Sequence, residues 1–80
     1  MRLDKFLKVS RLIKRRPVAA AACDNGKICV NGNIAKPGKQ LKTGDTVELT
    51  FGEKTVKIKV IKLCENVKKD AANEMYEVIL

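Results

Sequence analysis

The spacing of the apolar residues changes at Gly26, and this change constrains the fold more than any other feature of the sequence. Before Gly26 the apolar residues recur every three or four positions, which is typical of a helix with one buried face. After Gly26 they alternate with polar residues, which is typical of strands that cover a core on one side. Helices followed by a run of strands indicate an α+β fold. We therefore expect two short N-terminal helices packed on a small, mostly antiparallel sheet.

The first helix is expected to begin near Leu3. Its apolar stripe, with one serine on the same face, consists of Leu3, Phe6, Leu7, Ser10 and Ile13. Leu12 points away from this stripe, so the helix should end or bend there. Pro17 is favoured in a first helical turn, and Asn25-Gly26 is a typical helix stop. The second helix is therefore expected over residues 16–24.

The rest of the chain predicts short strands joined by turns. The strands are expected over residues 28–30, 34–35, 46–51, 56–63 and 75–80. Asn31-Gly32 is a strong signal for a tight hairpin turn between the first two, and residues 52–54 should link the third and fourth. Residues 65–74 are polar and are expected to form a loop. Phe6, Phe51 and Tyr76 all follow the apolar patterns, so we expect their rings to belong to the core.

The net charge of +8 is concentrated in the first half of the chain. Residues 1–42 hold eleven Lys and Arg against Asp4 and Asp24, a net +9. Residues 43–80 hold six Lys against seven acids, a net −1. Segregated positive charge is the electrostatic footprint of a protein that binds a polyanion. A basic surface kept only for solubility does not require such segregation, although it remains an alternative.

The densest part of this charge lies in the two predicted helices and the turn between them. The seven cations are Arg2, Lys5, Lys8, Arg11, Lys14, Arg15 and Arg16. We expect the first four to line one helix and the last two to begin the next. Arginine binds phosphate in a planar, bidentate manner, and the start of the second helix offers free N–H groups. Because exposed aromatic residues are nearly absent, we expect recognition of structured RNA through its backbone and shape.

Asp4 is the one acid among these cations, and two roles remain open for it. It either stabilises the helix terminus through the dipole or orients a neighbouring arginine. Lys36 is a further candidate RNA contact. For the whole basic segment, a merely solvated helix face is the alternative interpretation.

Several other classes of function are disfavoured. The chain has no His and no Gly-rich phosphate loop, so neither a catalytic pairing nor a nucleotide loop is indicated. Cys23, Cys29 and Cys64 lack the CxxC spacing of a zinc site. We therefore expect no enzyme activity, no metal and no cofactor. An odd number of cysteines and the lack of a membrane-spanning apolar run favour a cytoplasmic protein, which we expect to be a monomer.

Several strings of this sequence resemble the S4-type RNA-binding domain, a family named after the fourth protein of the small ribosomal subunit. They lie at residues 2–7, 11–16, 26–32, 36–37 and 44–45 (RLDKFL, RLIKRR, GKICVNG, KP and GD). The resemblance covers roughly residues 1–60, and it implies that the two helices and the following hairpin form the RNA-contacting face. We therefore expect one domain over residues 1–80, with the RNA-binding motif in 1–60 and C-terminal strands in 55–80.

Within this family, residues 1–16 (MRLDKFLKVSRLIKRR) resemble standalone factors of bacterial ribosome-associated quality control. The resemblance implies binding to a split large ribosomal subunit that still holds a peptidyl-tRNA, with contacts to both rRNA and tRNA. It implies stabilisation of the P-site tRNA while a partner of the RqcH type adds alanine to the stalled chain. Arg2, Asp4 and Arg16 match the positions through which such factors are expected to act.

A second standalone type, the large-subunit recycling factors of the heat-shock protein 15 type, shares residues 2–5 and 36–37. That type usually carries aromatic residues around the first helix and a long basic C-terminal extension, which this sequence does not show. Two residues depart from the family pattern: Arg15 stands where many members have a capping Ser, and Gly38 replaces a common Ser. A basic module that binds an acidic protein, and a detached pseudouridine synthase module, are further alternatives.

Overall fold

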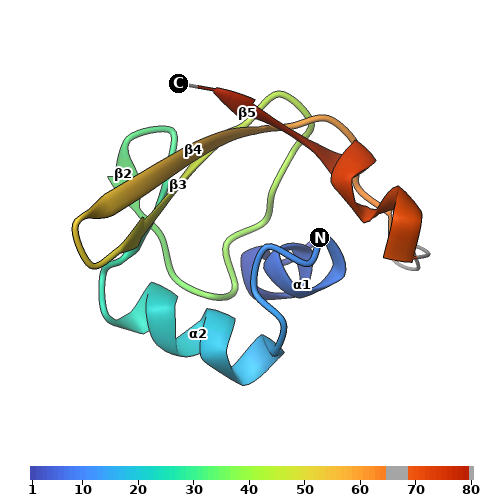
Figure 1. Cartoon of the computed structure of the whole chain (residues 1–80). Coiled ribbons are helices and arrows are strands. Elements are labelled where there is room, and N and C mark those ends of the chain that lie inside the picture. Colours follow the sequence, from blue (N-terminus) through green and yellow to red (C-terminus); the bar gives the residue numbers. More distant parts are fainter. Residues whose placement is uncertain (65–68, 80) are drawn as a thin grey trace.

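The computed structural model describes residues 1–64 and 69–79, which form two helices, a five-stranded sheet and a 3₁₀ helix. The elements in chain order are α1 (Leu3–Val9), α2 (Arg16–Asp24), β1 (Ile28–Val30), β2 (Asn33–Ile34), β3 (Thr46–Phe51), β4 (Lys54–Val60), η1 (Lys69–Met75) and β5 (Tyr76–Ile79). The strand order is β2-β1-β3-β4-β5, with antiparallel neighbours throughout. Both helices lie beneath the concave face of the arched sheet (Figure 1). The expected α+β architecture is therefore confirmed.

The first helix is shorter than its apolar stripe suggested. α1 ends at Val9, Ser10 is its C-cap, and Arg11 turns the chain with a φ of 63°. The Ser10 hydroxyl donates to the carbonyl of Leu7, a bond that competes with the helical ladder. The prediction that Arg11 lies on the first helix is therefore wrong. Ile13 is still buried, because its N–H returns to the carbonyl of Leu7 at 3.0 Å and folds the turn under the core.

The second helix, β1 and β3 follow the predicted pattern, whereas β4 spans residues 54–60 instead of 56–63 and so takes up the last residue of the expected turn at 52–54. α2 occupies the expected residues, and Gly26 follows it with a φ of 73°. The returning hairpin strand, β2, lies one residue earlier than expected. Near the C-terminus, η1 replaces residues 69–74 of the expected loop and Met75 of the expected last strand, because Ala72 and Met75 are buried there. Residues 65–68 of that expected loop, and Leu80 of the expected last strand, lie outside the described residues.

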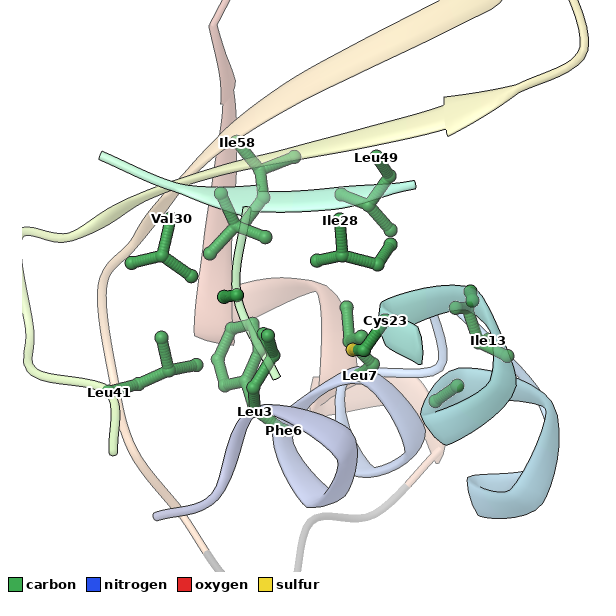
Figure 2. Close-up of a cluster of buried hydrophobic side chains, with 14 of the residues drawn as sticks. Leu3, Phe6, Leu7, Ile13, Cys23, Ile28, Val30, Leu41, Leu49 and Ile58 are labelled. Atoms are coloured by element: carbon green, nitrogen blue, oxygen red, sulfur yellow. The ribbon is translucent and has the colours of Figure 1, made fainter. Parts of the chain in front are cut away.

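The core fills the space between the helices and the sheet. Leu3, Phe6 and Leu7 rise from α1 toward the sheet, where Val30 and Ile58 face them (Figure 2). Phe6 is fully buried, as expected, and Tyr76 is half-buried against the core. Phe51 was expected in the core but is 45% exposed. Phe51 is the last residue of β3 and lies opposite Lys54 at the hairpin turn. This end of the β3–β4 hairpin extends past the buried cluster.

The segment between β2 and β3 runs down from the sheet to the helices and returns (Figure 1). It inserts Ala35 and Leu41 into the core, with 7% and 3% of their surfaces exposed. Its intervening turn, residues 36–40, is exposed apart from the half-buried Pro37. This excursion brings a turn from the middle of the chain beside the start of α1.

Within the described residues, no helix combines the length and apolar character needed to cross a bilayer.

The three cysteines are all free thiols but differ in burial. Burial raises the pKa of the Cys23 thiol to about 11, and the charges of Asp4 and Asp24 add to this effect. The thiolate is the reactive form. At pH 8 we therefore expect a maleimide to modify the half-buried Cys29 and Cys64 in the folded protein, and Cys23 only after unfolding.

Mass spectrometry of the adducts checks this expectation, with a Cys23→Ala variant as control. In buffer the variant should give the same two adducts as the parent. In denaturant it should give one adduct fewer than the parent. Three adducts on the folded parent would contradict the buried position of Cys23.

The raised pKa also means that the folded state holds this proton more tightly than the unfolded state. The resulting stabilisation is present below about pH 9 and is lost as the pH rises toward 11.

Candidate nucleic-acid interface

Two arginines from different helices meet at one buried carboxylate. Arg2 is the N-cap of α1, and its Nε donates to Asp4 Oδ1 at 3.2 Å. Arg16 is the first residue of α2, and its Nε donates to Asp4 Oδ2, also at 3.2 Å. We call this group, Arg2, Asp4 and Arg16, the arginine clamp. The Asp4 side chain is 6% exposed, whereas the arginine side chains are 51% and 43% exposed.

The exposure difference decides what the clamp is able to bind. Asp4 is enclosed and also accepts the backbone N–H of Lys5 at 2.8 Å, so its oxygens are occupied. Each guanidinium carries five N–H donors, and the pairing with Asp4 uses only part of them. Arg2 reaches Asp4 with a second, weaker contact from Nη2 at 3.4 Å. The remaining donors of two fixed guanidinium groups face solvent, which suits the recognition of phosphate oxygens.

The geometry shows both roles left open for Asp4: it accepts the N–H of Lys5 in the first turn of α1, and it pairs with two arginines. Its carboxylate fixes both arginines and joins the starts of α1 and α2. Removing this acid would leave two guanidinium groups close together without a counterion. The clamp is therefore an anchored pair of cations rather than a flexible charged surface.

The start of α1 is capped by the turn over residues 36–39 instead of by a side chain. The N–H groups of Leu3 and Asp4 donate to the carbonyls of Lys39 and Pro37 at 2.8 and 3.1 Å. Arg2 makes no side-chain cap. A Cβ added to Gly38 would lie 3.8 Å from the Arg2 guanidinium, so the turn lies beside the clamp. Lys36, an expected RNA contact, belongs to this turn.

The other expected RNA contacts fall into two groups. Lys8 is exposed and lies four residues after Asp4, so it continues the same face of α1 one turn further along. Lys14 and Arg15 are exposed in the turn before α2 and lie close in sequence to Arg16. Arg15 is the N-cap of α2 and makes no side-chain capping bond.

Lys5 and Arg11 differ from this arrangement. Lys5 is half-buried and already takes part in an interaction within the protein. Arg11 is exposed, but it lies in the reversal after α1 and not on the helix. The sequence reasoning also missed Lys39, which is exposed in the same turn as Lys36. The second lysine of the string Lys36-Pro37-Gly38-Lys39 was the available signal.

No metal site accompanies these residues in the described part of the chain. Groups of three or more His, Cys, Asp or Glu side chains that would hold an ion do not occur in residues 1–64 and 69–79.

The paired helices, the hairpin and the basic surface at the N-terminus define an S4-type domain. A model of the S4 domain family matches residues 1–47, and the chain belongs to this family. It is 56% identical over 79 residues to the RQC P-site tRNA stabilizing factor of Listeria monocytogenes, covering 99% of this chain and 86% of that protein. It is 53% identical over 78 residues to the protein of the same name from Halalkalibacterium halodurans, with 98% and 89% coverage.

A solved structure supports the assignment of the fold. Heat Shock Protein 15 of Vibrio cholerae superposes with a TM-score of 0.91 at 30% sequence identity. The match covers 99% of this chain and 81% of that one. The two helices and the five-stranded sheet are thus shared by a relative with a different name.

Proposed function

We propose that the arginine clamp binds phosphate groups of structured RNA. The observation that carries this proposal is the pair of half-exposed guanidinium groups fixed on one buried carboxylate. A fixed, charged donor pair loses little conformational freedom when it binds, which favours affinity. The surrounding cations extend the surface along the backbone of a duplex.

The proposed RNA-binding residues are those predicted from the sequence, with Asp4 acting by position and the others by contact. They are Arg2, Asp4, Lys5, Lys8, Arg11, Lys14, Arg15, Arg16 and Lys36. We also propose that residues 1–80 act as one domain, with the RNA-binding motif in residues 1–60 and supporting strands in 55–80. The family match over residues 1–47 supports the N-terminal part of this division.

We infer that the chain acts in bacterial ribosome-associated quality control. It binds the split large subunit with its peptidyl-tRNA, contacts rRNA and tRNA, and stabilises the P-site tRNA during alanine tailing by an RqcH-type partner. The names of relatives that are more than half identical over nearly the whole chain support this role. We also propose that the factor is cytoplasmic, non-enzymatic and monomeric, and the membership of an RNA-binding family supports the non-enzymatic part.

Sedimentation with large subunits tests this function. The tagged chain should travel with subunits that carry peptidyl-tRNA at moderate salt, and RNase treatment should release it. Retention after complete RNase digestion would favour the alternative of a basic module that binds an acidic protein. No co-sedimentation with tRNA-bearing subunits would contradict the proposal.

A recycling factor of the heat-shock protein 15 type is the second candidate, and the close structural match to such a protein favours it. Empty large subunits separate the two roles. A P-site factor should bind subunits with peptidyl-tRNA more tightly than subunits without it, since it then contacts two RNAs. Equal binding to both kinds of subunit would favour the second candidate.

A further inference from the structure

A groove lies between the β1–β2 hairpin and the turn that caps α1. Its walls are formed by Val30, Asn31, Asn33, Ile34, Ala35, Lys36 and Lys39, and its volume is about 360 Å³. This volume is at the lower end of the range found for small-molecule sites. No acidic residue lines the groove.

One wall is an exposed apolar side chain on an edge strand. Ile34 lies in β2, the outermost strand of the sheet next to β1, and 70% of its surface is exposed. It is the most exposed of the large apolar residues in the described chain. Water contacts most of this side chain unless a ligand covers it, and covering it is favourable in proportion to the apolar area removed from water.

The mouth of the groove carries two cations and an amide. Lys36 and Lys39 are both exposed, and within the described chain neither ammonium group has an ion-pair partner. The Asn33 amide donates to the carbonyl of Asn31 over 3.5 Å, a long contact that is easily exchanged. By contrast, Asn31 is held by Asp45 and by the N–H of Thr46, so it fixes the hairpin.

The turn at residues 36–39 borders both the groove and the clamp. Lys36 and Lys39 line the groove, and the carbonyls of Pro37 and Lys39 accept the N–H groups of Asp4 and Leu3 at the start of α1. A Cβ added to Gly38 would lie 3.8 Å from the Arg2 guanidinium, so the same turn lies beside the clamp.

We propose that this groove binds one unpaired nucleotide of an RNA whose helical part lies on the clamp. The base covers Ile34, the Asn33 amide meets its edge, and Lys36 and Lys39 contact the flanking phosphates. A paired base exposes only its edges, so the groove distinguishes an unpaired nucleotide from a duplex. This inference rests on the proposed function and adds a preference for duplex RNA interrupted by an unpaired base.

Two tetramers of equal charge test the groove: tetra-adenylate RNA and its abasic counterpart. The full chain should bind tetra-adenylate about fivefold more tightly, because only that probe covers Ile34. Ile34→Ala should remove most of this difference. Val78→Ala is the matched control, because Val78 is 56% exposed and lies on β5 at the opposite edge of the sheet. It should retain the fivefold preference.

Amide NMR spectra of the ¹⁵N-labelled chain locate the base. Tetra-adenylate should shift the signals of Asn33, Ile34 and Lys36, and the abasic tetramer should leave Ile34 unchanged. Replacing both groove lysines by Gln should lower the salt slope for either tetramer by about 1.4, from two contacts of about 0.7 each. Tetraglutamate is the probe for an acidic peptide, and equal shifts at Asn33 and Ile34 with that peptide would overturn the proposal.

A blunt RNA duplex separates the groove from the clamp. If the chain binds the duplex through Arg2 and Arg16 but binds both tetramers equally, the groove proposal is overturned and the proposed function stands. Binding to no RNA probe overturns both. The groove proposal also fails if Ile34→Ala keeps the full preference for tetra-adenylate.

Discussion

Replacing Arg2 and Arg16 together by Ala lowers the affinity for tRNA-bearing large subunits by about 100-fold at moderate salt. Hydrogen bonds to charged groups contribute about 1.5–3 kcal/mol each, so losing two guanidinium contacts is expected to cost at least this factor. The slope of log affinity against log salt should also fall by about 1.4 to 1.8, from two phosphate contacts of about 0.7–0.9 each. Sedimentation across a salt series measures both quantities. Arg16→Ala alone should lower the affinity by about tenfold and the salt slope by about 0.7–0.9.

A matched pair of cations elsewhere controls for net charge. Lys54 and Lys59 are exposed on β4, and replacing both by Ala removes the same charge. This variant should lose far less affinity and keep its salt slope nearly unchanged. If the two double variants lose affinity equally, the chain is attracted to RNA by its net charge alone and the clamp is not the RNA-binding site.

Asp4→Ala lowers the affinity for the same subunits by about tenfold, although it removes a negative charge from a surface that binds RNA. Simple electrostatics predicts the opposite sign, because the net charge rises by one. The expected loss arises because Asp4 fixes both guanidinium groups, so that each must be ordered again at binding without it. Asp24→Ala is the control, since that exposed acid at the end of α2 makes no contact with the clamp. It should leave the affinity unchanged or raise it.

The same substitution also tests the structural role of the carboxylate. Asp4→Ala is expected to lower the free energy of unfolding by about 1–2 kcal/mol, since hydrogen bonds to a buried charge are lost. The loss is moderate because both arginine side chains are about half exposed and regain water. Urea denaturation measures it. An unchanged stability together with a raised RNA affinity would show that Asp4 does not hold the clamp.

The order of the helices and strands followed from the spacing of the apolar residues. A helix or strand that buries one face repeats its apolar residues with its own period, which is visible in a short stretch of sequence. α2 was predicted at its true bounds, since Pro17 and Asn25-Gly26 mark its two ends locally. The end of α1 was not, because it depends on Ser10 bonding back to Leu7 and on Arg11 entering the left-handed region. Nothing in the local pattern distinguishes that reversal from continued helix.

Features that depend on distant contacts were missed. Alternation placed Phe51 in the core, but the helices beneath the sheet do not extend to the end of that hairpin. The 3₁₀ helix η1 depends on the burial of Ala72 and Met75, which a polar composition did not indicate.

The candidate interface shows the same division between local and distant information. Charge segregation indicated the right segment, and the resemblance singled out Arg2, Asp4 and Arg16. The sequence left two roles open for Asp4, because its role in orienting an arginine depends on a contact with Arg16 twelve residues away. The capping of α1 by residues 36–39 is a contact across more than thirty residues, so the place of Lys39 beside the clamp was not foreseen.

A cryo-electron microscopy map of the chain on a large subunit carrying peptidyl-tRNA tests the central claim most directly. We predict that the surface formed by α1, α2 and the turn at residues 36–39 faces RNA, with the Arg2 and Arg16 guanidinium groups within hydrogen-bonding distance of phosphate oxygens. The Asp4 contacts to both arginines should persist in the bound state. A map in which RNA meets the convex face of the sheet, and the clamp faces solvent, would contradict the account.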